Sequence, residues 1–401
     1  INGISNNEKA VLLLEKRTFK ELLVDMELRN LQNNIVGQEA SRLFARVEIN
    51  MGVEAFRDSL YSLLKRNTFL NIKFENMLDT LGEISRTDIR SLLGEWEKTT
   101  PLPFYSLGEP TLTKITNKGG EEFFVLKMLI SNNSDYDGII HMDIRKDGWW
   151  YQPLEDPRAK TKIEMPAHTS KEFVSVWEDQ IRNVEINTMV SGNLPNIISQ
   201  DINNVKQERN KIVKDSIYIL PESSFDLPGE IIVDNEDSTL FILSAPPIVG
   251  LLPKWLDEVE ETPFKYSGIS WWRPPLQWTA TTNDRYYGKY IRSAFVIKSG
   301  DGSQTATWKV PVPEVGQYDL YYHVFKDDEL RWNNNLQGEY HFKVKYGSEV
   351  EDAYVNLRKA NEGWEQLGSY YFDSDTVRVV LTDECKLRSV TADAVKIVKR
   401  Y

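Results

Sequence analysis

The chain contains 401 residues, a length that predicts two or three domains, each able to bury a hydrophobic core of its own. Hydrophobic residues make up 41% and charged residues 27%, as in ordinary globular proteins. The formal net charge of −12 argues against nucleic acid and an anionic membrane surface as partners. A single cysteine, Cys385, excludes an intrachain disulfide. The sequence contains no run of about 18 apolar residues, which is the length needed to span a membrane.

The beginning of the chain predicts helices. Leucine and phenylalanine side chains recur at helical spacing within residues 12–23 and again within residues 53–64. A further helix beginning near residue 87 is expected to end before Pro101, because a proline disfavours helical geometry in the residue before it. We therefore predict a helical segment over residues 1–103. Because the chain begins without methionine and without a signal peptide, we expect it to be a piece of a longer protein.

Strand patterns follow the helical segment. Residues 123–132 and 138–144 are rich in β-branched and other apolar side chains and are separated by a turn of Asn, Ser and Asp. Residues 171–177 also predict a strand, so we expect an immunoglobulin-like antiparallel β-sandwich over residues 104–198. The polar and charged run at residues 199–216 is expected to be a linker.

The last part of the chain has the clearest strand pattern. Apolar and polar side chains alternate within residues 362–398, with Val377, Val379 and Leu381 on one face. This period of two predicts three closing strands of an antiparallel, jelly-roll-like β-sandwich over residues 217–401. The whole chain is thus expected to be a multidomain α plus β protein, with a helical segment followed by two sandwiches.

The closing strands also resemble a known family. The runs GWEQLGSYYF at residues 363–372 and TADAVKIV at residues 391–398 are similar to the closing motif of the golvesin and xanthan-lyase type C-terminal domain. Upstream, an opening strand with an acidic turn at residues 231–237, a W…YYG segment at residues 278–288 and a hairpin at residues 305–321 follow in the family's order. Ordered matches over about 170 residues are more specific than one short motif.

The resemblance implies a β-sandwich of the kind attached to secreted bacterial enzymes and often assumed to bind carbohydrate. An insert near residues 242–270 departs from the family, which usually turns tightly there into its next strand.

A weaker resemblance covers residues 40–200. The helical patterns at residues 52–69 and 75–105 are similar to the region that follows the zinc site in M1-type metallopeptidases. The run GNLP at residues 192–195 resembles the end of the immunoglobulin-like domain in the same family. This resemblance implies that the parent protein is a peptidase.

The chain lacks the motif that an M1-type zinc centre requires. That centre needs HExxH on a helix, where two histidines four residues apart hold zinc and the glutamate acts as general base. Either the motif lies N-terminal to Ile1 or it was never present. We expect no catalytic residue, metal ligand or cofactor in this chain. The four histidines are expected to be ordinary strand or loop residues: His141, His168, His323 and His341.

Other candidate chemistry has simpler interpretations. Cys385 lies in the charged turn TDECKLR, where its acidic neighbours are expected to raise the thiol pKa and no nucleophilic role is expected. The oxygens of residues 234–237 could bind calcium, but a turn capped by its own side chains is the favoured interpretation. Asp393 is expected to stabilise a turn or a strand end rather than to bind a ligand.

Tryptophan and tyrosine are concentrated between residues 271 and 290. Exposed rings stack on sugars, whereas rings in small β domains often fill the core. Because Trp278, Trp308 and Trp364 lie in the family's strand motifs, we assign them to the core. The alternative to a sugar site in the remaining loops is that the insert packs on the preceding sandwich. The candidate carbohydrate-binding residues lie in or beside these loops: Trp271, Trp272, Arg273, Trp332 and Asn333.

We interpret the chain as the non-catalytic C-terminal region of a larger exported bacterial enzyme, an M1-like peptidase. Its last domain is expected to bind polysaccharide or protein at the cell envelope, which places it in the periplasm or at the cell surface. A structural or partner-docking module is one alternative, which an exposed apolar patch without an aromatic platform would favour. An enzyme acting on polysaccharide in its own right is the other, which a pocket with convergent carboxylates would favour.

The missing HExxH motif gives a first prediction. The isolated chain should hydrolyse no aminoacyl substrate, with or without added zinc, because it has no histidine pair to hold the metal. Release of a chromogenic amine from aminoacyl anilides measures this. Zinc-dependent turnover that survives repurification and is abolished by a chelator would contradict the interpretation.

Overall fold

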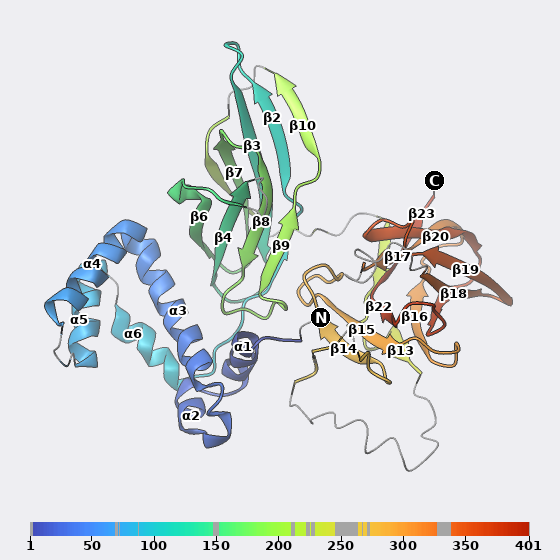
Figure 1. Cartoon of the computed structure of the whole chain (residues 1–401), viewed down its shortest axis with the longest axis horizontal. Coiled ribbons are helices and arrows are strands. Elements are labelled where there is room, and N and C mark those ends of the chain that lie inside the picture. The colour runs from blue at the N-terminus through green and yellow to red at the C-terminus, as the bar shows by residue number, and fades with distance from the viewer. Residues whose placement is uncertain are drawn as a thin grey trace. The chain divides into compact units, whose positions relative to one another are not determined.

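The structure is a computed structural model that describes residues 3–68, 71, 73–86, 88–146, 152–209, 213–221, 225, 229–244, 264–266, 268–270, 273–326 and 338–400. It divides into two compact units, Asn6–Phe225 and Asp226–Tyr401, the second of which also includes Ile1–Ser5. Figure 1 shows helices in the N-terminal part of the chain and sheets in the rest, which confirms the predicted α plus β architecture with β-sandwiches. No helix among the described residues has the length and apolar character needed to cross a membrane.

The helices of the first unit pack around two small apolar clusters. The first cluster includes Leu14, Phe19 and Ile35, and the ring of Trp96 lies 4.6 Å from that of Phe19. The second cluster forms where later helices pack on the C-terminal half of the long helix α3. As predicted, the last helix ends before Pro101. The helices are α1 (Asn6–Lys16), α2 (Phe19–Val24), α3 (Gln32–Met51), α4 (Val53–Arg66), α5 (Phe74–Ser85) and α6 (Ile89–Gly94).

Two sheets then form a sandwich whose apolar faces meet in a common core. One sheet has the strand order β10-β2-β3-β7-β11, with β1 also paired to β3, and the other has the order β5-β4-β8-β9, with β6 also paired to β4. Leu126 and Met128 of β3 pack with Ile140 and Met142 of β4 in that core. The strands are β1 (Tyr105–Leu107), β2 (Thr111–Thr116), β3 (Glu122–Asn132), β4 (Gly138–Lys146), β5 (Gln152–Pro153), β6 (Lys160–Met165), β7 (Thr169–Trp177), β8 (Ile181–Asn187), β9 (Ile197–Asp201), β10 (Val205–Arg209) and β11 (Ser216–Pro221).

The helices and this sandwich belong to the same compact unit. The backbone N–H of Asn196 donates to Glu8 Oε1 at 2.9 Å, and Glu48 of α3 forms an ion pair with Lys162 of β6. Val11 of α1 also packs with side chains that lie at the two ends of the sandwich segment in the sequence. These contacts join the predicted helical segment to the sandwich that follows it.

The structure corrects the expectation that residues 199–216 form a linker. Strand β10 pairs in parallel with β2, and β11, which begins at Ser216, pairs with β7, so about half of this run belongs to strands of the first sandwich. Ile202 is buried in the sandwich core, and the Asp215 carboxylate accepts a hydrogen bond from the Val176 N–H at 2.7 Å. The pairing of β10 is also an exception to the predicted antiparallel arrangement. Residues 210–212 lie outside the described part of the chain.

The second unit is a sandwich built around Trp308, which is fully buried. One sheet has the order β12-β23-β17-β20, the other has the order β13-β16-β21-β18-β19, and a three-stranded sheet has the order β14-β15-β22. The strands are β12 (Glu230–Val233), β13 (Phe241–Leu243), β14 (Thr279–Thr282), β15 (Ser293–Lys298), β16 (Thr305–Pro311), β17 (Gly316–Val324), β18 (Glu339–Tyr346), β19 (Glu349–Asn356), β20 (Gly363–Phe372), β21 (Thr376–Thr382), β22 (Ser389–Ala392) and β23 (Val395–Lys399).

The C-terminal alternation predicted three strands, and the structure has four. Strands β20 and β21 match the expectation, whereas the last expected strand is divided into β22 and β23 at Asp393 and Ala394. Of the insert near residues 242–270, residues 245–263 and 267 lie outside the described residues.

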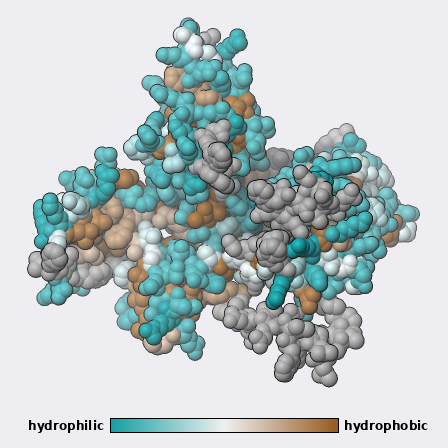
Figure 2. All heavy atoms as spheres, in the orientation of Figure 1, coloured by the Kyte–Doolittle hydropathy of each residue, from teal (hydrophilic) through white to brown (hydrophobic). Residues whose placement is uncertain are grey.

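On the face that Figure 2 shows, most of the described side chains are hydrophilic. Helix α4 is an exception, because Val53, Tyr61 and Leu64 are each more than half exposed. Their spacing places them on one face of the helix.

The corrected boundary predicts how fragments behave. A fragment of residues 6–225 should be more stable than one of residues 6–198, because the shorter fragment lacks β10, β11 and most of β9. Losing the buried Ile202 side chain alone should cost about 2–5 kcal/mol. Urea denaturation followed by circular dichroism compares the two fragments. If the two fragments are equally stable, residues 199–216 contribute nothing to the sandwich and act as a linker.

Candidate functional site

A β-bulge in β20 determines which residues reach the outer face of the second unit. Leu320 of β17 pairs with Gly368, but the next residue, Tyr321, pairs with Gln366. Leu367 is therefore an extra residue in β20. An extra residue reverses the alternation of the strand, because side chains alternate between the faces of a sheet with a period of two.

The bulge places Trp364 on the outer face. Beyond it, Tyr370 and Phe372 are buried in the core, as the alternation predicts. Before it, Trp364 pairs with His323 of β17, is half-buried and does not belong to the core cluster. The assignment of Trp364 to the core was therefore wrong, whereas Trp308 does occupy the core. A glycine within a strand often marks a bulge, so Gly368 was the available signal in the sequence.

Trp364 belongs to a group that we call the aromatic surface, made of the partly buried rings of Tyr287, Tyr321, His323 and Trp364 together with the buried Lys396. The ring of Trp364 lies 5.1 Å from that of Tyr287 and 5.1 Å from that of His323. The Lys396 ammonium lies 4.8 Å from the centre of the Trp364 ring and 5.3 Å from that of Tyr321. Such distances fit cation–π contacts. Lys396 also forms an ion pair with Glu230 at 2.9 Å.

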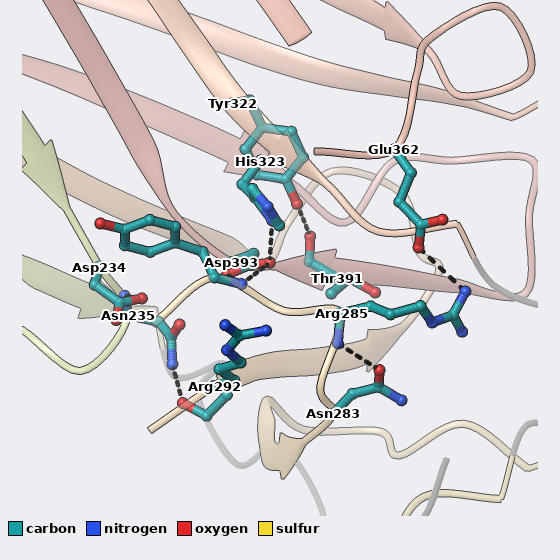
Figure 3. Close-up of polar contacts among 12 residues, drawn as sticks. Asp234, Asn235, Asn283, Arg285, Arg292, Tyr322, His323, Glu362, Thr391 and Asp393 are labelled. Carbon is teal, nitrogen blue, oxygen red and sulfur yellow. Dashed lines mark hydrogen bonds and ion pairs between the residues drawn. The ribbon is translucent and has the colours of Figure 1, made fainter. Parts of the chain in front are cut away.

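The Asp393 side chain is completely buried, and Figure 3 shows its carboxylate next to His323. Its oxygens accept hydrogen bonds from the Tyr287 N–H at 3.2 Å, and Oδ2 lies 2.9 Å from His323 Nδ1. The backbone carbonyl of Asp393 accepts a hydrogen bond from Trp308 Nε1 at 3.2 Å. Asp393 therefore connects the loop that carries Tyr287 with strand β17 and with the core.

Burial has opposite effects on the acidic and basic groups around Asp393. It raises the pKa of the Asp393 carboxyl, while His323, the Tyr287 N–H and Arg292 lower that pKa. Arg292 is partly buried, and desolvation lowers the pKa of its guanidinium, whose Nη1 donates to the Asp284 carbonyl at 2.7 Å. A buried carboxylate with these partners avoids the cost of an unpaired buried charge.

The acidic turn at residues 234–237 lies close to Asp393. Burial, and next the charge of Asp393, raise the pKa of Asp234 well above its ordinary value. The Asp234 N–H donates to Asp237 Oδ2 at 3.0 Å, and the Asp237 N–H donates to the Asp234 carbonyl at 3.1 Å. The Asn235 amide is oriented so that its nitrogen donates to the Ser293 carbonyl at 2.7 Å and to Asp234 Oδ1 at 2.8 Å, while its oxygen accepts from Ser293 Oγ at 2.7 Å. These contacts are those of a capped turn.

A comparison with known families identifies the domain that carries the aromatic surface. Residues 274–399 match the family model of the Golvesin C-terminal domain. The second unit contains a golvesin-type domain. The matched range includes all members of the aromatic surface as well as Asp393 and Arg292. No curated protein matches the sequence significantly.

Some solved structures are distantly similar to the chain. A β-glucuronidase of Bacteroides uniformis is 12% identical over 79% of this chain and 32% of its own, with a TM-score of 0.22. The β-glucuronidase 2 of the same organism, covalently bound to cyclophellitol-6-carboxylate aziridine, is 13% identical over 79% and 32%, with a TM-score of 0.21. The Sulfolobus turreted icosahedral virus structure is 10% identical over 76% and 96%, with a TM-score of 0.16. This chain spans about a third of the length of the two glucuronidases, and TM-scores this low establish no functional relationship.

The predicted carbohydrate site falls mostly outside the described residues. Trp271, Trp272, Trp332 and Asn333 are not among them. Arg273 is described and exposed, and its N–H donates to the Ser270 carbonyl at 3.0 Å. Sequence reasoning did not find the aromatic surface, since His323 and Asp393 are 70 positions apart and form no local motif.

Cys385 and possible metal ligands were the remaining candidates for chemistry. Burial, not the acidic neighbours, is the largest cause of the raised pKa of the Cys385 thiol. No three His, Cys, Asp or Glu side chains among the described residues are placed to hold a metal ion.

The raised pKa of Asp234 predicts a pH-dependent stability of the golvesin-type domain. The folded state keeps a proton that the unfolded state releases, so stability should fall as pH rises from the ordinary Asp value of about 3.9 through the raised pKa. Asp234→Asn should reduce this fall by about 1.4 kcal/mol for each unit by which the pKa is raised. Calorimetry of the full chain between about pH 4 and 8 measures the effect.

The exposed Asp373 provides the control for this experiment. Asp373→Asn should leave the pH dependence of the domain's melting temperature unchanged. If Asp234→Asn also leaves it unchanged, the Asp234 carboxyl does not titrate as described.

Proposed function

We propose that the chain is the non-catalytic C-terminal region of a larger exported bacterial enzyme, an M1-like peptidase. In this proposal the golvesin-type domain binds polysaccharide at the cell envelope through the aromatic surface. The observation that carries the proposal is the group of Tyr287, Tyr321 and Trp364 rings, half-buried on one outer face and fixed by the bulge and by Asp393.

The chemistry of the aromatic surface suits a sugar. The apolar C–H face of a pyranose packs against an aromatic ring, while neighbouring polar groups bond its hydroxyls. The exposed Gln366 and the partly buried His323 supply such polar groups on the same face of the sheet. Because the rings already contact one another, little side-chain entropy would be lost on binding.

The alternative of a polysaccharide-acting enzyme has less support. Glycosidases usually need two carboxyl groups that flank the scissile bond. Asp393 is completely buried and bonded to the Tyr287 N–H, so it cannot touch a substrate. Asp234 is held within its own turn by Asn235 and Asp237.

The proposal of a larger parent protein has two supports. The family resemblance implies a domain that is attached to secreted enzymes. The exposed apolar side chains Val53, Tyr61 and Leu64 lie on one face of α4, as expected of a helix on which a further domain packs. The M1-type resemblance of the helical segment suggests a peptidase domain for this position.

Removal of one ring tests the proposed sugar site. Trp364→Ala should weaken retention of the full chain on insoluble polysaccharides such as cellulose and xylan about fivefold, because a stacked ring contributes about 1 kcal/mol. Its melting temperature should fall much less than that of Trp308→Ala, which removes a fully buried ring at a cost of about 3–5 kcal/mol. Affinity electrophoresis and calorimetry give the two measurements.

Tyr136, an exposed tyrosine of the first unit, provides the matched control. Tyr136→Ala should leave retention unchanged. Loss of stability in Trp364→Ala comparable to that in Trp308→Ala, with full retention of polysaccharide, would assign the aromatic surface to packing.

A further inference from the structure

The opposite sheet of the golvesin-type domain carries a row of cations. Arg378 of β21 pairs directly with Lys309 of β16 and with Lys345 of β18. Lys343 lies two residues from Lys345 and so projects from the same face. We call these four residues the basic face. Their neighbours in sequence, such as Trp308 and Val344, are buried in the core, so the four cations point outward.

The cations of the basic face have no acidic partner. None of the four forms an ion pair or a side-chain hydrogen bond with the residues that the structure describes. Asp352 pairs in register with Lys343, but its carboxylate lies 2.7 Å from His341 Nε2 instead. By contrast, Lys396 and Lys399 on the other sheet are paired with glutamates.

This arrangement has a cost in stability. Like charges directly opposite each other on neighbouring strands repel, and Arg378 faces such a neighbour on both sides. Because adjacent strands are about 4.8 Å apart, the backbones of these three residues lie in a row that spans about 10 Å across the sheet. An anionic ligand laid along this row would remove the repulsion.

We propose that the basic face binds a linear anionic polysaccharide, with carboxylate or sulfate groups of successive sugars lying along Lys309, Arg378 and Lys345. Charge complementarity is the first support, because a guanidinium between two ammonium groups suits evenly spaced anions. The exposed ring of Tyr354 is the second. It lies at the end of the same face, stacked on His341 with centroids 4.8 Å apart and an angle of 7°. One side of this ring can stack on a sugar.

A polysaccharide fits this face better than other polyanions do. Duplex DNA carries one charge per about 1.7 Å, so a chain of net charge −12 would repel it strongly beyond the small basic face. An anionic membrane surface meets the same repulsion. A polysaccharide with one charge per sugar is less dense in charge. The basic face and the aromatic surface lie on different sheets, so each site can fail without the other.

Arg378→Glu tests the proposal in the full chain. Wild-type protein should be retained by polygalacturonate in affinity electrophoresis at about 50 mM salt, and the variant should lose retention about tenfold. Its melting temperature should stay equal or rise, since the new carboxylate lies between two lysines that repelled Arg378. A residue with a purely structural role would lose stability instead. Retention by uncharged dextran should be the same for wild type and variant.

Lys298→Glu is the matched control, because Lys298 is an exposed lysine on another sheet of the domain and gives the same change in charge. It should change retention less than twofold. Failure of wild type to bind polygalacturonate, or equal losses in both variants, would overturn the proposal. So would tighter Arg378-dependent binding to duplex DNA or to phosphatidylglycerol vesicles. Trp364→Ala should retain binding to polygalacturonate. If this variant loses that binding, the basic face is not a site separate from the aromatic surface.

Discussion

The burial of one carboxylate, that of Asp393, is the constraint on which the outer surface of the golvesin-type domain depends. A buried charge is tolerated only when hydrogen bonds and opposite charges compensate it. The Tyr287 N–H, His323 Nδ1 and the nearby Arg292 supply this compensation. Tyr287 and Arg292 come from the loop between β14 and β15, and His323 comes from β17. Because the same residue accepts a hydrogen bond from the Trp308 indole through its carbonyl, the loop and the strand are fixed to the centre of the core.

The two outer faces of the domain differ in how their charges are arranged. On the aromatic surface the cation is neutralised and lies over rings, as in the Lys396–Glu230 pair. On the basic face the cations lie side by side without acidic partners among the described residues. The first arrangement suits stacking of uncharged sugar faces, and the second suits anions. A polysaccharide that contains both kinds of sugar would engage both faces.

The sequence was sufficient where burial of one face determines a strand. The alternation of Val377, Val379 and Leu381 predicted β21 because a shift by one residue would turn its apolar side chains to solvent. The same rule failed for Trp364, since one extra residue in β20 reversed the alternation. It also failed for β10, whose exposed Lys, Gln, Glu and Arg side chains are typical of an edge strand and resemble a linker. The Asp393 contacts depend on tertiary pairing and have no local pattern.

The central claim is that the bulge at Leu367 presents Trp364 to a ligand while Trp308 remains in the core. Nuclear magnetic resonance of the indole N–H groups tests this directly, with the two signals assigned from Trp364→Phe and Trp308→Phe variants. On titration with soluble polysaccharide fragments, the Trp364 signal should shift and the Trp308 signal should stay in place. Shifts in other indole signals with an unchanged Trp364 signal would place the ligand elsewhere and contradict the account.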